Sequence, residues 1–168
     1  GKEFGFGVTE TPAFKLEDQL VSSTKIRQKL FAGDISAANV MLGYRYKMSG
    51  KVVFGNQIGR NLGFPTANLA LNDKLKLIPK NGIYASYTEV EGQSYKSMTY
   101  IGNRPTLDKK KPTIETHLFD YNKDIYGKEI KIELIDYVRE QVQFPDTEAL
   151  KRAIADDEKK VLDILNQC

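Results

Sequence analysis

Apolar residues follow a strand-like pattern through the middle of the chain and a helical pattern toward both ends. The strand-like runs, rich in Tyr, Ile, Val and Thr, are residues 46–54, 82–90, 93–101, 113–120 and 129–138. In the last run, Ile130, Ile132, Leu134 and Val138 fall on one face. The sequence Val-Glu-Gly-Gln at 90–93 predicts a hairpin turn. Successive strands without intervening helices predict an antiparallel sheet or a small barrel.

Helix signals flank these strands. Residues 1–21 are loop-like, and the Ser-Ser-Thr cluster at 22–24 offers N-caps for a helix that ends at Gly33. Asp34 caps a second predicted helix, which Gly43 closes. Asp146 caps a long predicted helix whose apolar face should pack on the barrel. The residues of that face are Leu150, Ile154, Val161 and Leu165, with Ile164 beside them.

Composition and charge narrow the function classes. The 168 residues are 40% hydrophobic and 28% charged, as in an ordinary globular domain, and the net charge of +3 is too weak to indicate nucleic-acid binding by itself. Cys168 is the only cysteine, which excludes an internal disulfide and fits a cytoplasmic protein. No apolar run is long enough to span a membrane. The chain starts at Gly1 without a signal-peptide pattern, so we expect it to begin inside a longer protein.

The segment from 54 to 69 is the first candidate for chemistry. Gly55, Gly59 and Gly63 allow the backbone to approach a ligand closely, and Arg60 offers a guanidinium suited to phosphate oxygens. The segment matches neither the phosphate-binding P-loop nor the dinucleotide fingerprint. The pattern alone leaves open that these glycines only form turns.

Thr66 and Asn68 are two residues apart in an extended segment, so their side chains should project to the same side. A hydroxyl and an amide oxygen are ligands that Mg²⁺ accepts together with water and phosphate oxygens. The alternative is that both side chains close a turn through hydrogen bonds to the backbone.

Glu115 is the candidate general base. It should lie on the opposite face of its strand from Ile114 and Thr116, where a carboxylate can accept the proton of a substrate hydroxyl. His117, the only histidine, shares that face, and we interpret it as a supporting or packing residue. The lysine-rich stretch at 107–112 is interpreted as a solvated loop.

Several motifs occur in the order found in one family: GRNLGFPTANL, IPKNGIYA, YIGNRPT, ETHLFD, DIYGKEI and YVREQVQF. Together they resemble riboflavin kinases, specifically the kinase module of bacterial bifunctional riboflavin kinase/FMN adenylyltransferases. The resemblance implies a mainly β fold: a six-stranded antiparallel Greek-key barrel with short N-terminal helices and a long C-terminal helix. It also implies phosphorylation of riboflavin at its ribityl 5′-hydroxyl, with ATP and a divalent cation such as Mg²⁺, to give FMN.

The resemblance also implies roles for individual residues. Thr66 and Asn68 match a motif that binds the metal and the ATP phosphates, and Glu115 matches the proposed base. The nucleotide-covering loop would include Gly55, Gly59 and Arg60. Arg139, in the flavin-side loop, would bind the flavin.

A second resemblance concerns the N-terminal residues. Residues 1–32 are similar to the end of the adenylyltransferase module, in which Ser23, Thr24 and Arg27 would contact ATP; residues 33–168 would form the kinase domain. In this chain the alternative for that motif is a helix cap with a solvated arginine.

Two other functions are less consistent with the sequence. A non-catalytic flavin-binding barrel would need no metal ligands, which argues against it. A nucleic-acid-binding barrel would place aromatic residues among basic ones, whereas the 9 Tyr and 8 Phe are scattered. The expected partners are therefore ATP and riboflavin, with neither nucleic acid nor membrane; the sequence leaves the oligomeric state open.

Overall fold

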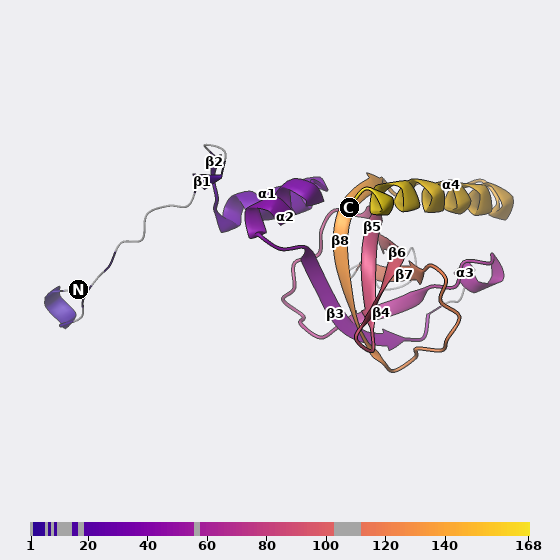
Figure 1. Ribbon diagram of the computed structural model, residues 1–168, viewed down its shortest axis with the longest axis horizontal. Helices are drawn as coiled ribbons and strands as arrows, with labels where there is room; N and C mark the ends of the chain where they lie inside the picture. The colour runs from indigo at the N-terminus through magenta and orange to yellow at the C-terminus, as the bar shows by residue number, and fades with distance from the viewer. Residues whose placement is uncertain are drawn as a thin grey trace.

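A closed barrel of six antiparallel strands forms the body of the protein (Figure 1). The computed structural model describes residues 2–5, 7, 9, 15–16, 19–55, 58–102 and 112–168. The barrel strands are β3 (Tyr46–Val53), β4 (Ala67–Leu71), β5 (Gly82–Val90), β6 (Gln93–Gly102), β7 (Thr113–Leu118) and β8 (Glu129–Arg139). Around the barrel their order is β3-β4-β7-β6-β5-β8, so the connections from β4 to β5 and from β7 to β8 cross between strands that are not neighbours. The six-stranded barrel expected from the motifs is confirmed.

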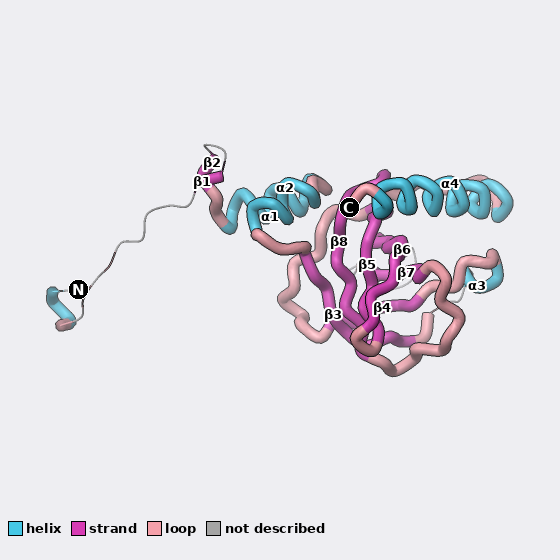
Figure 2. Tube along the Cα trace, viewed as in Figure 1, coloured by secondary structure: helices cyan, strands magenta, loops and turns pink. Residues whose placement is uncertain are grey.

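Helices lie outside the barrel (Figure 2). Near the N-terminus, α1 (Ser23–Ala32) and α2 (Ile35–Leu42) pack on each other, and α2 contacts β8 and β3. At the C-terminus, α4 (Thr147–Asn166) packs on β5, β6 and β8. Shorter elements are η1 (Lys2–Phe4), β1 (Lys15–Leu16), β2 (Gln19–Leu20) and α3 (Ile58–Asn61). In the described part of the chain, no helix combines the length and the apolar character that crossing a bilayer requires.

The helix caps form as the sequence predicts. The side chains of Ser22, Asp34 and Asp146 each accept a hydrogen bond from a backbone N–H in the first turn of α1, α2 and α4 respectively. Gly33 and Gly43 end the first two helices with positive φ angles of 85° and 74°. The β5–β6 hairpin turns at Glu91 and Gly92, both with positive φ, which is the two-residue turn that matches strand twist.

One predicted side-chain direction is wrong. Ile130, Ile132 and Leu134 of β8 are buried in the barrel core, but Val138 packs in a second cluster together with residues of α4. The pairing of β8 with β5 is irregular at Ile135 and at Val138, so neither of these residues lies opposite a residue of β5. The irregularity at Ile135 reverses the alternation of faces, so Tyr137 packs against the barrel core and Val138 points toward α4 instead of into the barrel.

The barrel core also contains a group of hydroxyl side chains that no pattern in the sequence indicated. Five fully buried residues of β5, β6 and β7 hydrogen-bond to one another at Oγ–Oγ distances of 2.7–3.2 Å. They are Ser86, Thr88, Ser97, Thr99 and Thr116. No buried side-chain nitrogen or oxygen among the described residues lacks a hydrogen-bond partner, so the group is compatible with an otherwise apolar interior.

Candidate active site

Three residues that the sequence singled out meet on the outer face of β4 and β7. Asn68 of β4 lies directly opposite Glu115 of β7 in the strand register. Thr66, just before β4, lies 3.3 Å from Glu115, measured from Thr66 Oγ1 to the carboxylate Oε2. Ala67 between them turns inward and is buried in the core cluster. The prediction that Thr66 and Asn68 project to the same side is therefore confirmed, and Glu115 joins them.

Close packing explains two of the loop's glycines. A Cβ atom at Gly55 would lie 2.3 Å from the amide nitrogen of Asn68. A Cβ at Gly59 would lie 2.4 Å from the carbonyl oxygen of Phe64. At Gly59 the neighbour is backbone, so packing excludes any side chain there. At Gly55 the neighbour is the Asn68 side chain, which a Cβ would displace. These contacts give both glycines a packing role beside the ligand approach that the sequence pattern indicated.

The Gly-rich segment also contains a helical turn, although glycines and a proline disfavour helices. α3 occupies Ile58–Asn61, and the N–H groups of Leu62 and Phe64 both bond to the carbonyl of Gly59. Gly63 then adopts a φ of 91° and ends the turn. A single turn of this kind is closed by local hydrogen bonds, so it needs little intrinsic helix propensity.

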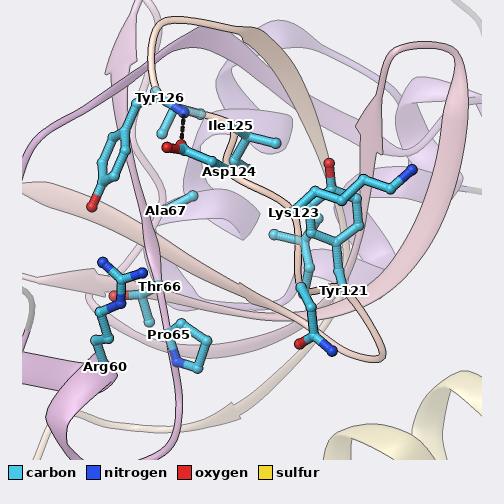
Figure 3. Close-up of a pocket in the computed structure, with 12 residues that line it drawn as sticks. Arg60, Pro65, Thr66, Ala67, Tyr121, Lys123, Asp124, Ile125 and Tyr126 are labelled. Carbon is cyan, nitrogen blue, oxygen red and sulfur yellow. Dashed lines mark hydrogen bonds between the residues drawn. The ribbon is translucent and has the colours of Figure 1, made fainter.

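A cavity of about 390 Å³ opens beside Thr66 (Figure 3). Arg60, Pro65 and Thr66 line one part of it, and six consecutive residues, 121–126, line the rest together with Val52, Ala67 and Leu118. Lys123 gives this wall a second positive charge. The pocket is therefore bordered by two cations, the Asp124 carboxylate and the Thr66 hydroxyl, and the guanidinium, the ammonium and the hydroxyl are groups suited to phosphate oxygens.

The loop between β7 and β8 lines this pocket, but the sequence analysis named none of its residues as a candidate site residue. The side chain of Asp124 accepts a hydrogen bond from the backbone N–H of Tyr126 at 2.9 Å, which holds the turn (Figure 3). The ring of Tyr126 stacks on the exposed ring of Phe54, with centroids 4.1 Å apart. The motif DIYGKEI covers this turn, so its aromatic and acidic residues were the available signal.

His117 lies on the same face of β7 as Glu115. Its Nδ1 atom is 2.7 Å from the carbonyl oxygen of Pro65, the residue before Thr66. Its ring meets those of Phe64 and Phe119 edge-on. These contacts agree with the interpretation of His117 as a supporting residue.

Arg139 is away from the pocket, on β8. Its guanidinium binds the carboxylate of Asp157 on α4 through three hydrogen bonds of 2.6–3.0 Å. Another of its N–H groups donates to the carbonyl of Glu140, and the guanidinium lies 5.7 Å from the ring centre of Phe144. Asp157 was not predicted from the sequence, although its spacing from Ile154 and Val161 places it on the apolar face of the helix.

One row of residues links Glu115 to Arg139 around the barrel. Glu115 is opposite Tyr100, Tyr100 is opposite Ile83, and Ile83 is opposite Arg139. Three strand spacings separate the ends of the row, or about 14 Å along the surface. A Cβ at Gly102 would meet the hydroxyl of Tyr100, so the ring of Tyr100 folds over the end of β6. Residues 103–111, which include most of YIGNRPT and of the lysine-rich stretch, lie outside the described residues.

The N-terminal motif lies at a separate hollow of about 570 Å³ between α1, α2 and the barrel. Ser23 and Arg27 line it, next to Leu30 and Tyr46. Thr24 occupies the first turn of α1. Burial raises the pKa of Tyr46 to about 12, and its hydroxyl donates to the carbonyl of Leu77 at 2.6 Å.

Comparison with known proteins identifies the family. The profile of the family described as flavokinase (riboflavin kinase) matches residues 42–165. A bifunctional riboflavin kinase/FMN adenylyltransferase of Haemophilus influenzae is 36% identical over 157 residues, which are 93% of this chain and 50% of that protein. The chain thus spans about half the length of the curated relatives it matches.

Solved structures agree with this fold. A crystal structure described as a macrolide-efflux protein from Streptococcus pneumoniae superimposes with a TM-score of 0.83 at 34% identity, covering 89% of this chain and 49% of that one. The riboflavin kinase of Trypanosoma brucei superimposes with a TM-score of 0.51 at 27% identity, covering 71% of this chain and 79% of that one. The barrel and the profile match coincide over residues 46–139, and the chain therefore belongs to the riboflavin kinase family.

Proposed function

We propose that this chain transfers the γ-phosphoryl group of ATP to the ribityl 5′-hydroxyl of riboflavin, giving FMN and ADP. The observation that carries the proposal is the meeting of Thr66, Asn68 and Glu115 at the edge of a pocket bordered by Arg60 and Lys123. Phosphoryl transfer depends mainly on positioning and on neutralising phosphate charge, and these residue types supply both.

The nucleotide would occupy the pocket with its phosphates near Thr66. Arg60 and Lys123 would counter the charge of the phosphate oxygens. Tyr126, which lines the pocket, stacks on Phe54 and would offer an aromatic surface to the nucleotide. No group of three or more His, Cys, Asp or Glu side chains in the described part of the chain is arranged to hold a metal. Phosphate and water oxygens would therefore complete any coordination shell, as is usual for Mg²⁺.

Thr66 and Asn68 fit a divalent cation by the chemistry of their donor atoms. When the Thr66 hydroxyl donates a hydrogen bond to Glu115, the lone pairs of the hydroxyl oxygen remain available to a cation. The amide oxygen of Asn68 is a second hard donor on the same face. A cation held there would neutralise negative charge on the transferring phosphoryl group.

Glu115 would act as the general base. As the 5′-hydroxyl oxygen bonds to the γ-phosphorus, the bond from that phosphorus to the β,γ-bridging oxygen breaks and ADP leaves. The hydroxyl proton passes to the Glu115 carboxylate. Riboflavin would approach Glu115 from the side of Tyr100, toward the loop that follows Arg139.

Arg139 would support flavin binding by anchoring the loop that follows β8. Because its guanidinium is held by Asp157 and by the carbonyl of Glu140, it ties the loop after β8 to α4. Residues 140–146 of that loop would then form the flavin-side wall.

The N-terminal residues would belong to a second activity of the parent protein. We infer that residues 1–32 are the end of an adenylyltransferase module and that 33–168 form the kinase domain. Ser23 and Arg27 beside the hollow at α1 support this assignment. Assayed alone, this chain should stop at FMN, because one helix does not constitute a site that aligns ATP with FMN.

The test is to incubate the purified chain with riboflavin, ATP and Mg²⁺ and to separate the flavins by chromatography. We expect FMN to accumulate with ADP in equal amounts and no FAD to form. Tight riboflavin binding without turnover would instead support a non-catalytic flavin-binding barrel. Formation of FAD would contradict the assignment of residues 1–32.

A further inference from the structure

The β4–β7 ladder includes Asn68 but ends before Thr66, the other candidate metal ligand. Its last residue pair is Ala67 with Thr116. Continued by one step, the same register would place Thr66 opposite His117. Thr66 lies outside β4, however, so strand pairing does not determine where its hydroxyl lies. Some other contact has to hold this corner of the chain.

The side chain of His117 makes that contact. Its Nδ1 lies 2.7 Å from the carbonyl oxygen of Pro65, and since a carbonyl only accepts, Nδ1 must carry a proton and donate. Pro65 has no N–H of its own to bond to β7, so its carbonyl is the backbone group available at that residue. The histidine thus supplies the hydrogen bond that the ladder lacks beyond Ala67.

The ring of His117 is itself held in place. It meets Phe64 edge-on at 5.8 Å between ring centres and Phe119 edge-on at 5.5 Å. Phe64 belongs to the Gly-rich loop, whereas Phe119 is buried in the cluster that packs against α4. His117 therefore joins the loop to a fixed part of the protein through two ring contacts and one hydrogen bond.

We propose that His117 is a positioning residue that holds the Pro65–Thr66 corner so that the Thr66 hydroxyl faces Glu115 and the nucleotide pocket. This inference rests on the proposed function only in giving Thr66 a role in binding the nucleotide. The hydrogen bond from Thr66 to Glu115 is long, at 3.3 Å, and both residues are assigned to bind or react with substrate. The shorter bond from His117 involves neither side chain, so it can persist through the reaction.

Two variants separate the hydrogen bond from the packing. His117→Phe keeps an aromatic ring between Phe64 and Phe119 but removes the donor. His117→Asn removes the ring but places an amide N–H near the position of Nδ1. Tyr87→Phe is the matched control: it removes a hydroxyl that donates to the carbonyl of Leu165 at 3.3 Å, between β5 and the end of α4.

The first measurement is hydrogen exchange of the backbone amides in residues 58–68, which does not depend on catalysis. We expect His117→Phe to speed exchange in this segment by about five- to tenfold, as for the loss of one hydrogen bond. His117→Asn should recover most of the protection, and Tyr87→Phe should leave it unchanged. Unchanged exchange in His117→Phe would overturn the proposal.

The second measurement is steady-state kinetics with each substrate varied in turn. His117→Phe should raise KM for ATP about five- to tenfold while KM for riboflavin changes by less than about twofold, and His117→Asn should reverse most of the rise. A purely structural role predicts lower thermal stability in both variants with neither KM altered, which would contradict the inference. If the parent chain forms no FMN, the proposed function fails, and the exchange data alone decide the role of His117.

Discussion

The ion pair between Arg139 and Asp157 gives the sharpest prediction about how α4 is attached to the barrel. The Asp157 side chain is only 3% exposed and accepts three hydrogen bonds from Arg139. Arg139→Met would leave this carboxylate buried without those donors, which typically costs about 3–5 kcal/mol. Since the Arg139 side chain itself is 24% exposed, water can enter its place, and we expect the lower end, about 3 kcal/mol.

Replacing Asp157 instead of Arg139 should lower the stability of the fold by less. Asp157→Leu removes the buried charge and leaves an arginine that can turn toward solvent, so we expect a loss of about 1.5 kcal/mol. In the double variant no unpaired buried charge remains, and a leucine suits the apolar face formed by Val161 and Leu165. The double variant should therefore be no less stable than Asp157→Leu, so that the effects are non-additive by about 3 kcal/mol.

Urea unfolding followed by circular dichroism measures these differences, and thermal unfolding checks them. A loss of about 3 kcal/mol corresponds to a fall in Tm of roughly 6–12 °C for a domain of this size. If Arg139→Met costs less than about 1 kcal/mol, or if the two changes simply add, the carboxylate is not held as the structure indicates.

The two single variants and the double variant also test the role of Arg139 in flavin binding. Riboflavin affinity, measured by quenching of flavin fluorescence, should fall in Arg139→Met because the loop after β8 loosens. If Arg139 only anchors that loop to α4, the double variant should recover affinity to within about threefold of the parent. Affinity that stays low in the stable double variant would show direct contact with the flavin.

Four further predictions concern single residues. Glu115→Gln should lower kcat by about 10²-fold or more while riboflavin affinity is kept; near-parental turnover would remove Glu115 as the base. Thr66→Val should weaken ADP binding in the presence of Mg²⁺ but not in its absence, as measured by calorimetry, and equal binding of parent and variant with Mg²⁺ would refute metal ligation. Gly55→Ala should displace the Asn68 side chain, since the new Cβ would lie 2.3 Å from its amide nitrogen, and should raise KM for ATP; an unchanged KM would show that Asn68 takes no part. Burial raises the pKa of Tyr46 to about 12, so the stability that its neutral phenol contributes is complete below about pH 10 and is lost as pH rises toward 12; in alkaline unfolding, Tyr46→Phe should flatten this decline, and an identical profile would contradict it.

The sequence by itself determined the elements and their local ends. Alternation and β-branched residues predicted the five long strands, and Ser22, Asp34 and Asp146 predicted the helix starts, because a cap depends on a hydrogen bond within the next three residues. The sequence also predicted on which face of a strand each side chain lies, wherever the strand pairing is regular. Glu115 and His117 therefore fell on the predicted face of β7.

Only the tertiary structure decided what depends on contacts between distant segments. Val138 changed sides because β8 carries an irregularity set by its pairing with β5, which no local pattern encodes. Gly55 was interpreted from the sequence as a residue of the nucleotide-covering loop, and only the structure shows that the side chain of Asn68, on a neighbouring strand, lies where a Cβ on Gly55 would be. Arg139 and Asp157 form an ion pair although they are 18 residues apart in the sequence. His117 hydrogen-bonds to the carbonyl of Pro65, which is 52 residues away. In each case the sequence supplies the chemical group, and the closure of the barrel supplies its partner.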